Sequence, residues 1–306
     1  MIIDIFLYLC TQIDKDMRLI YKVAGHCFAV NIDEKDVIVG QLKQYEPFRV
    51  AEADPASVVF ELDVVDPAVF PSSEGYNEET TQDDDGSQIS AGHVGEKPYF
   101  EFLLRGKRAA RLMTNGEYDH AVVALEGERL FGINNALMVM YALATSNRQT
   151  ALFHSSVIGY EGKGYMFLGK SGTGKSTHSS LWLKHIEGTE LMNDDNPVVR
   201  IIDGKPWVFG SPWSGKTPCY RNVKAPLGAI VRLSQAPYNK IRRLKGIEAY
   251  AAVVPSISGK RWDKKLAEGL HETENLLAGK ARIFHLECLP DEAAARLCLS
   301  EVKNEA

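Results

Sequence analysis

The segment that most constrains the fold is Gly169–Ser176, which reads Gly-Lys-Ser-Gly-Thr-Gly-Lys-Ser. It fits the pattern Gly-x-x-x-x-Gly-Lys-Ser/Thr of a phosphate-binding loop, in which backbone N–H groups surround an anion. Such a loop lies between a buried strand and the start of a helix. The short apolar run 164–168 precedes it, and apolar positions clustered as on a helix face follow it in 176–185. The sequence therefore predicts strand, loop and helix in this order, whereas a Gly- and Ser-rich surface turn would match the pattern only by accident.

The residue types in this segment predict a nucleotide site. A lysine in the position of Lys175 reaches the β- and γ-phosphates of a nucleoside triphosphate, and a hydroxyl in the position of Ser176 meets Mg²⁺. We therefore expect a nucleoside triphosphate and Mg²⁺ as cofactors. The predicted nucleotide-binding residues are Gly169, Lys170, Ser171, Gly172, Thr173, Gly174, Lys175, Ser176 and Thr177.

The bulk properties of the chain limit the class of protein. With 306 residues, 45% of them hydrophobic and 25% charged, it can form two globular domains. A net charge of −5 argues against nucleic acid as a partner. No apolar run reaches the ~18 residues that a membrane-spanning helix needs. The cysteines are odd in number and never spaced Cys-x-x-Cys, so we expect reduced thiols and a cytoplasmic location: Cys10, Cys27, Cys219, Cys288 and Cys298.

Three segments are expected along the chain: an N-terminal extension (1–16), a β-rich domain (17–148) and an ATP-binding domain (149–306). The first residues are hydrophobic, but they carry Asp4 and lack a basic start and a cleavage site, so we do not expect a signal peptide. Translation starting at Met17 is an open alternative. The fold class expected is mixed α/β, or α+β, with a β-rich N-terminal domain before a domain built around the phosphate-binding loop.

The β-rich domain is predicted from short apolar and β-branched runs separated by turn residues. A long apolar helix is expected at Ile133–Thr145. The polar interval between Pro71 and Pro98 contains Asp83–Ser87 and is expected to be a solvated loop or a hairpin tip. The strands are predicted at 19–23, 27–32, 48–51, 58–65, 99–104, 109–113 and 121–125.

Two adjacent carboxylates, Asp194 and Asp195, end a short apolar run 18 residues beyond Ser176. A carboxylate at the end of a strand beside a phosphate-binding loop lies where a Mg²⁺ ligand is needed. With two, one can hold the metal while the other accepts a proton from an attacking hydroxyl. A turn or a helix N-cap is the alternative for such a pair. We predict a metal site formed by Ser176, Asp194 and Asp195, with the roles of the two aspartates left open.

Two further features are candidates for catalysis. The Gly-, Pro- and Ser-rich segment Phe209–Asn222 carries Lys216 and Arg221, which suit contact with a phosphate or carboxylate. An ordinary connection with solvated cations is the alternative. His154 lies in the run 152–157, which reads as the strand before the one that leads into the loop. A strand histidine is also typical of a core or edge position.

The order of His154, Gly169–Ser176 and Asp194-Asp195 resembles the C-terminal kinase domain of HPr kinase/phosphorylase, over roughly residues 150 to 300. That domain has the ATP-dependent phosphoenolpyruvate carboxykinase type of phosphate-binding-loop fold. The resemblance implies that His154 lies in the active site, Lys175 on the transferred phosphate and Ser176 on Mg²⁺, with the base and metal roles shared by the two aspartates. The segment 209–222 is similar to that of bacterial paralogues described as HPr kinase-like. No Lys-Pro-Gly-Arg-Asn-like segment follows residue 230, which departs from the family.

The function expected is transfer of the ATP γ-phosphate to a hydroxyl or carboxylate acceptor, with catalytic residues His154, Lys175, Asp194, Asp195, Lys216 and Arg221. The acceptor, whether protein, peptide or small molecule, stays open. No nucleic-acid or membrane partner is expected, and homo-oligomers are typical of relatives of this fold. The alternative is a nucleotide-binding module without turnover, in which ATP orders the domain for a protein partner.

Overall fold

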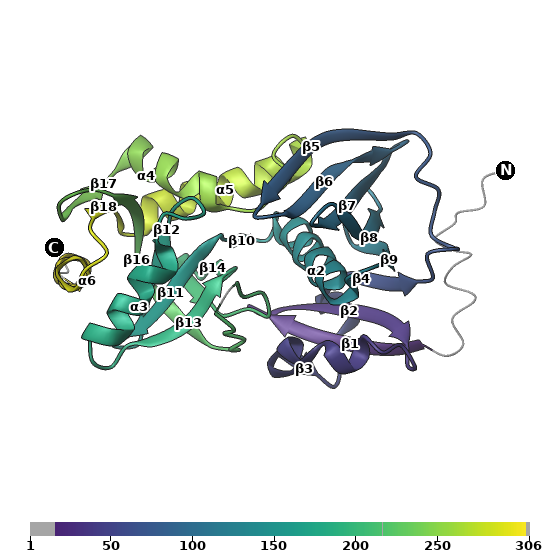
Figure 1. Cartoon of the computed structure of the whole chain (residues 1–306), viewed down its shortest axis with the longest axis horizontal. Coiled ribbons are helices and arrows are strands. Elements are labelled where there is room, and N and C mark those ends of the chain that lie inside the picture. The colour runs from purple at the N-terminus through teal and green to yellow at the C-terminus, as the bar shows by residue number, and fades with distance from the viewer. Residues whose placement is uncertain (1–15, 216, 304–306) are drawn as a thin grey trace. The chain divides into compact units, whose positions relative to one another are not determined.

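The computed structural model describes residues 16–215 and 217–303. Most of the expected N-terminal extension therefore lies outside the described residues. The chain divides into two compact units, residues 1–144 and 145–306, whereas the sequence places the division between 148 and 149. Each unit contains both strands and helices (Figure 1), and hydrophobic clusters occur within each unit. Both units combine large sheets with helices, so the mixed α/β class is confirmed.

The described part of the first unit forms a nine-stranded sheet in the order β3-β1-β2-β4-β9-β8-β7-β6-β5. Strand β4 is parallel to β2 and β9, and all other neighbours are antiparallel. Short 3-10 turns lie at Val39–Gln41, Lys43–Phe48 and Pro55–Ser57. The strands are β1 (Asp16–Val23), β2 (His26–Asp33), β3 (Arg49–Val50), β4 (Val58–Val65), β5 (Tyr76–Asp84), β6 (Ser87–Val94), β7 (Lys97–Leu104), β8 (Lys107–Thr114) and β9 (His120–Leu125).

The strands predicted from apolar runs are all present in this sheet, and the polar interval adds two more. Of the two possibilities left open for that interval, the hairpin is correct: β5 and β6 pair from Tyr76↔Val94 to Asp84↔Ser87. Asp85 and Gly86 turn between them with φ of 54° and 79°, as the hairpin turns that suit strand twist require. The strand β5 is exposed along nearly its whole length, so it has no apolar period by which a sequence pattern could identify it.

The predicted apolar helix is α2 (Arg129–Thr145), which begins at Arg129 instead of Ile133. Its Tyr141 is fully buried and donates a hydrogen bond to the Val23 carbonyl at 3.0 Å. Gly132 lets the helix approach the sheet, since a Cβ there would lie 2.7 Å from the Ala109 carbonyl. The helix is therefore part of the core of the first unit.

The second unit has a mixed sheet in which β13, β11 and β12 are antiparallel, while β12, β16 and β18 are parallel. Strand β17 adds to β18, and β10-β14-β15 continue from the start of β16. The strands are β10 (Thr150–Leu152), β11 (Ser155–Tyr160), β12 (Lys163–Leu168), β13 (Glu190–Asp195), β14 (Val198–Ile202), β15 (Lys205–Phe209), β16 (Lys224–Gln235), β17 (Lys240–Leu244) and β18 (Ile283–Cys288). The helices are α3 (Lys175–His185), α4 (Gly246–Val253), α5 (Lys264–Lys280) and α6 (Glu292–Lys303), with a 3-10 turn η4 (Val254–Ser256) after α4.

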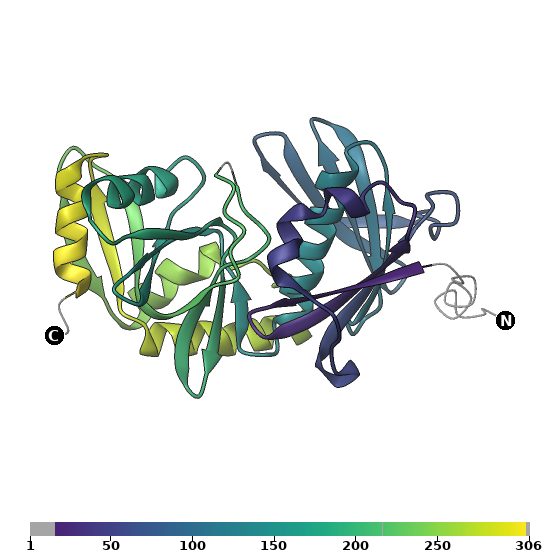
Figure 2. The same cartoon turned by 90° about the horizontal axis from the view of Figure 1, so that it is seen from below.

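Helices cover both faces of this sheet (Figure 2). Because side chains alternate along a strand, Ile158, Phe167 and Val231 pack with α3 and α6, whereas Val157 and Met166 pack with α4 and α5. The last helix has an acidic start, where the Asp291 carboxylate accepts the Ala294 N–H at 2.8 Å. Residues 169–174 thus follow a strand buried on both faces.

Two properties of the described residues bear on the class of protein. No helix among residues 16–215 and 217–303 combines the length and apolar character that a membrane crossing requires. The described cysteines, Cys27, Cys219, Cys288 and Cys298, are free thiols.

Candidate functional site

The register of three strands brings His154, the segment that begins at Gly169 and the Asp194-Asp195 pair to one edge of the second unit's sheet. Ser155, at the start of β11, lies opposite both Leu168 at the end of β12 and Asp195 at the end of β13. Gly169 and His154 are the next residues beyond this edge. The candidate site is therefore built where β12 ends, β13 ends and β11 begins.

His154 is not on a strand, contrary to the sequence-based expectation. It lies at a bend between β10 and β11, because the chain leaves one set of strands for the other at this point. Its backbone N–H donates to the Ser256 carbonyl at 2.7 Å, and the neighbouring Phe153 N–H donates to the Pro197 carbonyl at 3.0 Å. These bonds hold the bend and direct the imidazole toward the loop that follows β12.

The predicted order of strand, loop and helix is present, as β12, residues 169–174 and α3. Gly172 and Gly174 have φ of 77° and 105°, which other residues rarely adopt. The Thr173 N–H donates to the Lys170 carbonyl at 3.1 Å and closes the turn. Gly174 is the N-cap of α3 and offers no side-chain cap. The first N–H groups of a helix have no partner within the helix, so this end of α3 suits an anion.

Lys175 connects the loop to His154. Its ammonium lies 2.9 Å from His154 Nε2, 3.0 Å from the Gly169 carbonyl and 3.4 Å from the Lys170 carbonyl. An ammonium has no acceptor capacity, so His154 Nε2 accepts and the imidazole carries its proton on Nδ1. The lysine is only 9% exposed, so its ammonium is held among these acceptors and not in solvent.

The Nδ1 of His154 lies 2.9 Å from Asp195 Oδ1. With the tautomer set by Lys175, this contact is an Nδ1–H donating to a carboxylate. The other Asp195 oxygen accepts from the Asn196 side-chain amide at 2.8 Å. Lysine, imidazole and carboxylate therefore form one hydrogen-bonded chain at the mouth of the loop.

Asp194 faces a different partner. Its Oδ1 accepts the Ser176 hydroxyl at 3.0 Å, and the residue is 4% exposed. Two cis ligands of an octahedral Mg²⁺ stand about 3.0 Å apart, given metal–oxygen distances of about 2.1 Å. The described residues contain no group of three or more His, Cys, Asp and Glu side chains with metal-ligand geometry. A hydroxyl and one carboxylate at this spacing fit Mg²⁺, which takes its remaining ligands from water and phosphate.

Sequence reasoning did not identify the residues that hold the aspartate pair in place. Asn193 is fully buried and its side-chain amide donates to the Ser211 hydroxyl at 3.2 Å and the Trp213 carbonyl at 3.3 Å. The Asp194 carbonyl accepts from the Ser214 hydroxyl at 3.0 Å and from the Gly215 N–H at 2.7 Å. The asparagines on both sides of the pair, Asn193 and Asn196, were the available sequence signal.

The segment 209–222 contributes its backbone to the site, but the structure does not bring Arg221 there. Arg221 donates to the Leu191 carbonyl at 2.6 Å and to Glu190 at 2.8 Å. These residues begin β13, whereas the aspartates end it, about 10 Å away at ~3.3 Å per residue. These two contacts hold the Arg221 guanidinium at the start of β13, away from Lys175. Lys216 lies outside the described residues.

His178 belongs to the core below the loop. Its ring packs edge-on against Phe167, and its Nε2 accepts the Trp182 indole N–H at 3.1 Å. Burial lowers the pKa of His178 from 6.5 to about 4, because desolvation penalises the charged imidazole. The residue is neutral near pH 7 and structural.

Comparison with known proteins leaves the site to be interpreted from its own geometry. No protein-family model and no curated protein matches the chain. Among solved structures, it is similar to one described as the Hpr(Ser) kinase/phosphatase from Coxiella burnetii, with a TM-score of 0.30 and 11% sequence identity. The match covers 50% of this chain and 94% of that chain. At this TM-score the likeness carries no residue roles, which rest on the contacts above.

Proposed function

We propose that the chain is an ATP- and Mg²⁺-dependent phosphotransferase that moves the γ-phosphate to a hydroxyl or carboxylate acceptor. The observation that carries this proposal is the hydrogen-bonded chain Lys175–His154–Asp195 beside the Ser176–Asp194 pair. A binding site for phosphate needs the loop and the lysine. A site that only binds phosphate does not need a second carboxylate that orients an imidazole. Such an oriented imidazole is needed where a proton is transferred.

Ser176 and Asp194 are the residues that would hold Mg²⁺, directly or through water. When bound, the ion neutralises the charge of the β- and γ-phosphates. Asp194 is well suited because it is nearly buried and fixed through its own backbone carbonyl, which accepts from Ser214 and Gly215. A rigid carboxylate loses little conformational entropy on binding a metal ion.

Lys175 is proposed to exchange its present acceptors for a phosphate oxygen when nucleotide binds. Two of them are loop carbonyls, of Gly169 and Lys170, and the third is His154 Nε2. The exchange leaves Nε2 able to accept a proton. The base is thereby available only with nucleotide in place.

In the proposed step a hydroxyl acceptor gives its proton to His154 Nε2. The acceptor oxygen forms a bond to the γ-phosphorus as the bond from that phosphorus to the bridging oxygen breaks, leaving ADP. Asp195, which accepts from Nδ1–H at 2.9 Å, stabilises the positive imidazolium that results. A carboxylate acceptor is already deprotonated and needs only the phosphate and metal contacts.

Phosphotransfer tests this function directly. Purified protein is incubated with Mg²⁺ and γ-labelled ATP, with acceptor panels of proteins, peptides and small hydroxy and carboxylic acids. We expect label on an acceptor and a loss of at least ~100-fold in Lys175→Met. Lys184→Met is the matched control, since Lys184 is an exposed residue of the same helix. Its rate should equal that of the wild type.

Calorimetry, combined with the transfer assay, distinguishes a phosphotransferase from the alternative, a nucleotide-binding module without turnover. Calorimetry measures ATP affinity in the wild type, Asp194→Ala and Asp195→Ala. A binding module is identified by two results together. The wild type binds ATP tightly but transfers no phosphate to any acceptor, and Asp195→Ala binds ATP with the affinity of the wild type. No ATP binding at all contradicts both functions.

A further inference from the structure

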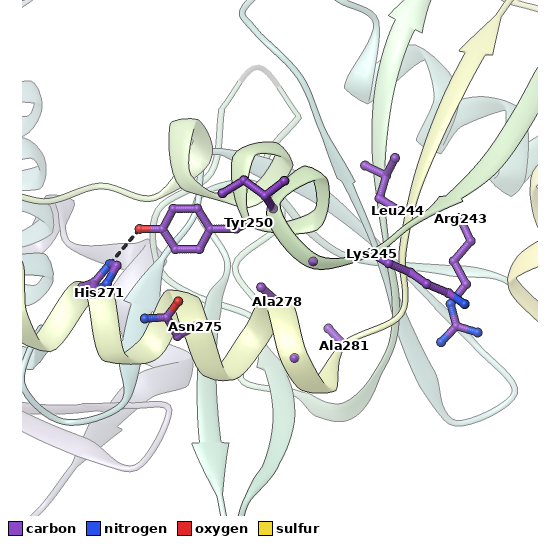
Figure 3. Close-up of a pocket in the computed structure, with 11 residues that line it drawn as sticks. Arg243, Leu244, Lys245, Tyr250, His271, Asn275, Ala278 and Ala281 are labelled. Atoms are coloured by element: carbon purple, nitrogen blue, oxygen red, sulfur yellow. Dashed lines mark hydrogen bonds between the residues drawn. The ribbon is translucent and has the colours of Figure 1, made fainter.

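The second unit contains a pocket that none of the residues discussed so far enters. Its volume is about 610 Å³, and it lies between α4, α5 and the end of β17. Figure 3 shows Tyr250 and His271 at one end, Arg243 and Lys245 at the other, and α5 along one side. A volume of this size is within the range of small-molecule sites.

The pocket is separate from the candidate functional site. Strand β17 lies three strands from β12, beyond β16 and β18, which is about 14 Å at ~4.8 Å per strand. Leu244, on the pocket wall, pairs with Ile283 at the start of β18. None of the phosphate-loop residues lines the pocket.

The charge of the lining is one-sided. Arg243 and Lys245 contribute positive charge to it, and no described Asp or Glu lines the pocket. The carboxylate packed behind it, Glu274, is 1% exposed and forms an ion pair with Arg261. In a chain with net charge −5, a lining with cations and without acids favours an anionic ligand.

The side of the pocket between its two ends is apolar and small. Ala278 and Gly279 of α5 line it together with Ala281, the residue after the helix, and a Cβ built on Gly279 meets nothing within 4 Å. Ile247, on the opposite wall, is 78% exposed. The small residues leave the volume of the pocket open. Covering the exposed Ile247 side chain with an apolar group would remove apolar surface from water, which is favourable.

We propose that this pocket is a second ligand site, which binds a small organic anion: a carboxylate or phosphate ester joined to an apolar body. The anionic group meets Arg243 and Lys245. The apolar body lies between Ile247 and the small residues of α5, and Asn275 offers a hydrogen bond to a polar substituent.

The wall of this pocket is connected to His154, and this part of the inference rests on the proposed function. Helix α4 carries Tyr250 and continues into η4, whose last residue, Ser256, accepts the His154 N–H at 2.7 Å. Tyr250 donates to Glu274 at 2.8 Å, and Arg261, paired with Glu274, donates to the Val254 carbonyl at 3.0 Å. A ligand that draws α4 toward α5 therefore acts on the segment that fixes the base.

Binding is tested without nucleotide, by amide NMR of the full chain titrated with benzoate and phenyl phosphate, and with neutral benzamide as control. We expect shifts at 243–250 and 271–281 with both anions and none with benzamide. Shifts at 169–177 report the phosphate-binding loop and are counted apart. Equal binding of benzamide, or anion shifts confined to 169–177, overturns the proposal.

Two variants locate the site. Lys245→Gln should weaken binding of both anions by about tenfold, the effect of losing one charge-assisted hydrogen bond. Lys240→Gln, an exposed lysine of β17 outside the pocket, should not. Gly279→Leu fills the pocket and should abolish binding. Wild-type affinity in Lys245→Gln or Gly279→Leu contradicts the site.

The connection has its own readout. At saturating benzoate the amide resonances of His154 and Ser256 should shift, and the shift should disappear in Gly279→Leu. Pocket binding with unchanged His154 and Ser256 resonances overturns the connection and leaves the ligand site. Because neither titration contains ATP, failure of the proposed phosphotransfer does not affect these results.

Discussion

Asp195 has a backbone conformation that few side chains adopt, with φ of 126°. Such a conformation costs roughly 1–3 kcal/mol and is maintained only where the surroundings determine it. Here the surroundings are the Ser214 bridge, the Asn196 amide and the nearby Gly215, where a Cβ would lie 3.0 Å from that of Asp195. In this conformation the Asp195 carboxylate contacts His154 Nδ1 at 2.9 Å, which is the contact that the proposed function uses.

Replacing Asp195 with asparagine tests this role. Asp195→Asn keeps an acceptor for His154 Nδ1–H but removes the charge that stabilises an imidazolium, so we expect kcat for a hydroxyl acceptor to fall by about 10²–10⁴. ATP affinity should change little. Asp203→Asn is the control, because Asp203 is an exposed turn residue that also has positive φ. An unchanged kcat in Asp195→Asn would exclude a role of the Asp195 charge in proton transfer to His154.

The buried His178 makes stability depend on pH. Its pKa is about 4 in the folded protein against 6.5 for an ordinary histidine, so between these values the unfolded chain binds the proton and the folded chain does not. The contribution of this pKa difference to the free energy of unfolding is fully present above about pH 6.5. It is lost as the pH falls to about 4, and in total it amounts to about 3 kcal/mol. His178→Gln keeps an acceptor for Trp182 and removes the titration. The unfolding free energies of wild type and variant should converge by this amount on acidification; parallel curves would contradict the assignment.

At the scale of the element, α5 offers two glycines with opposite surroundings. A Cβ on Gly279 meets nothing within 4 Å, whereas one on Gly269 lies 2.7 Å from the Ser146 carbonyl and from the Asn147 Cα. The helix is therefore packed closely near its start and open where it lines the pocket. Helix propensity alone treats the two positions alike.

Alanine at each position gives the matched measurement. Gly279→Ala should raise the free energy of unfolding by about 0.4–1 kcal/mol, because alanine reduces the entropy of the unfolded chain at no steric cost. Gly269→Ala should lower it by about 1–3 kcal/mol through overpacking. Denaturant unfolding followed by tryptophan emission measures both. Effects of the same sign would show that packing of α5 does not differ between its two ends.

The whole molecule consists of two units with hydrophobic clusters of their own. The chain has four tryptophans, at 182, 207, 213 and 262, all of them in the second unit. Tryptophan emission therefore follows that unit alone. The candidate site also belongs to it entirely, which makes ligand effects separable by unit.

Nucleotide binding should stabilise the second unit selectively. At an ATP concentration about 100 times Kd, with Mg²⁺, stability should rise by about 2.7 kcal/mol, seen as a higher denaturant midpoint of tryptophan emission. Hydrogen exchange should slow in peptides from β12, α3 and β13 and stay unchanged in those from β6–β9. Lys175→Met should show neither effect. Protection gained chiefly in the first unit would contradict the location of the site.

The sequence by itself determined the local elements of this protein. Apolar runs predicted seven strands of the first unit and the strand before Gly169, and the glycines of 169–174 predicted the turn into α3. These are local properties, set by side-chain period and by the φ range that glycine allows. The exposed β5 escaped prediction because a strand without a buried face has no period.

Only the tertiary structure decided which groups meet. Register places Ser155 opposite Asp195 and Leu168. From this follow the contacts of Asp195 with His154 and of Asp194 with Ser176. The sequence left open which of the two adjacent aspartates would make which contact. The same folding holds Arg221 at the other end of β13, on Glu190. Strand order and register depend on the whole core, so the side-chain partners of a residue are not written in its neighbours along the chain.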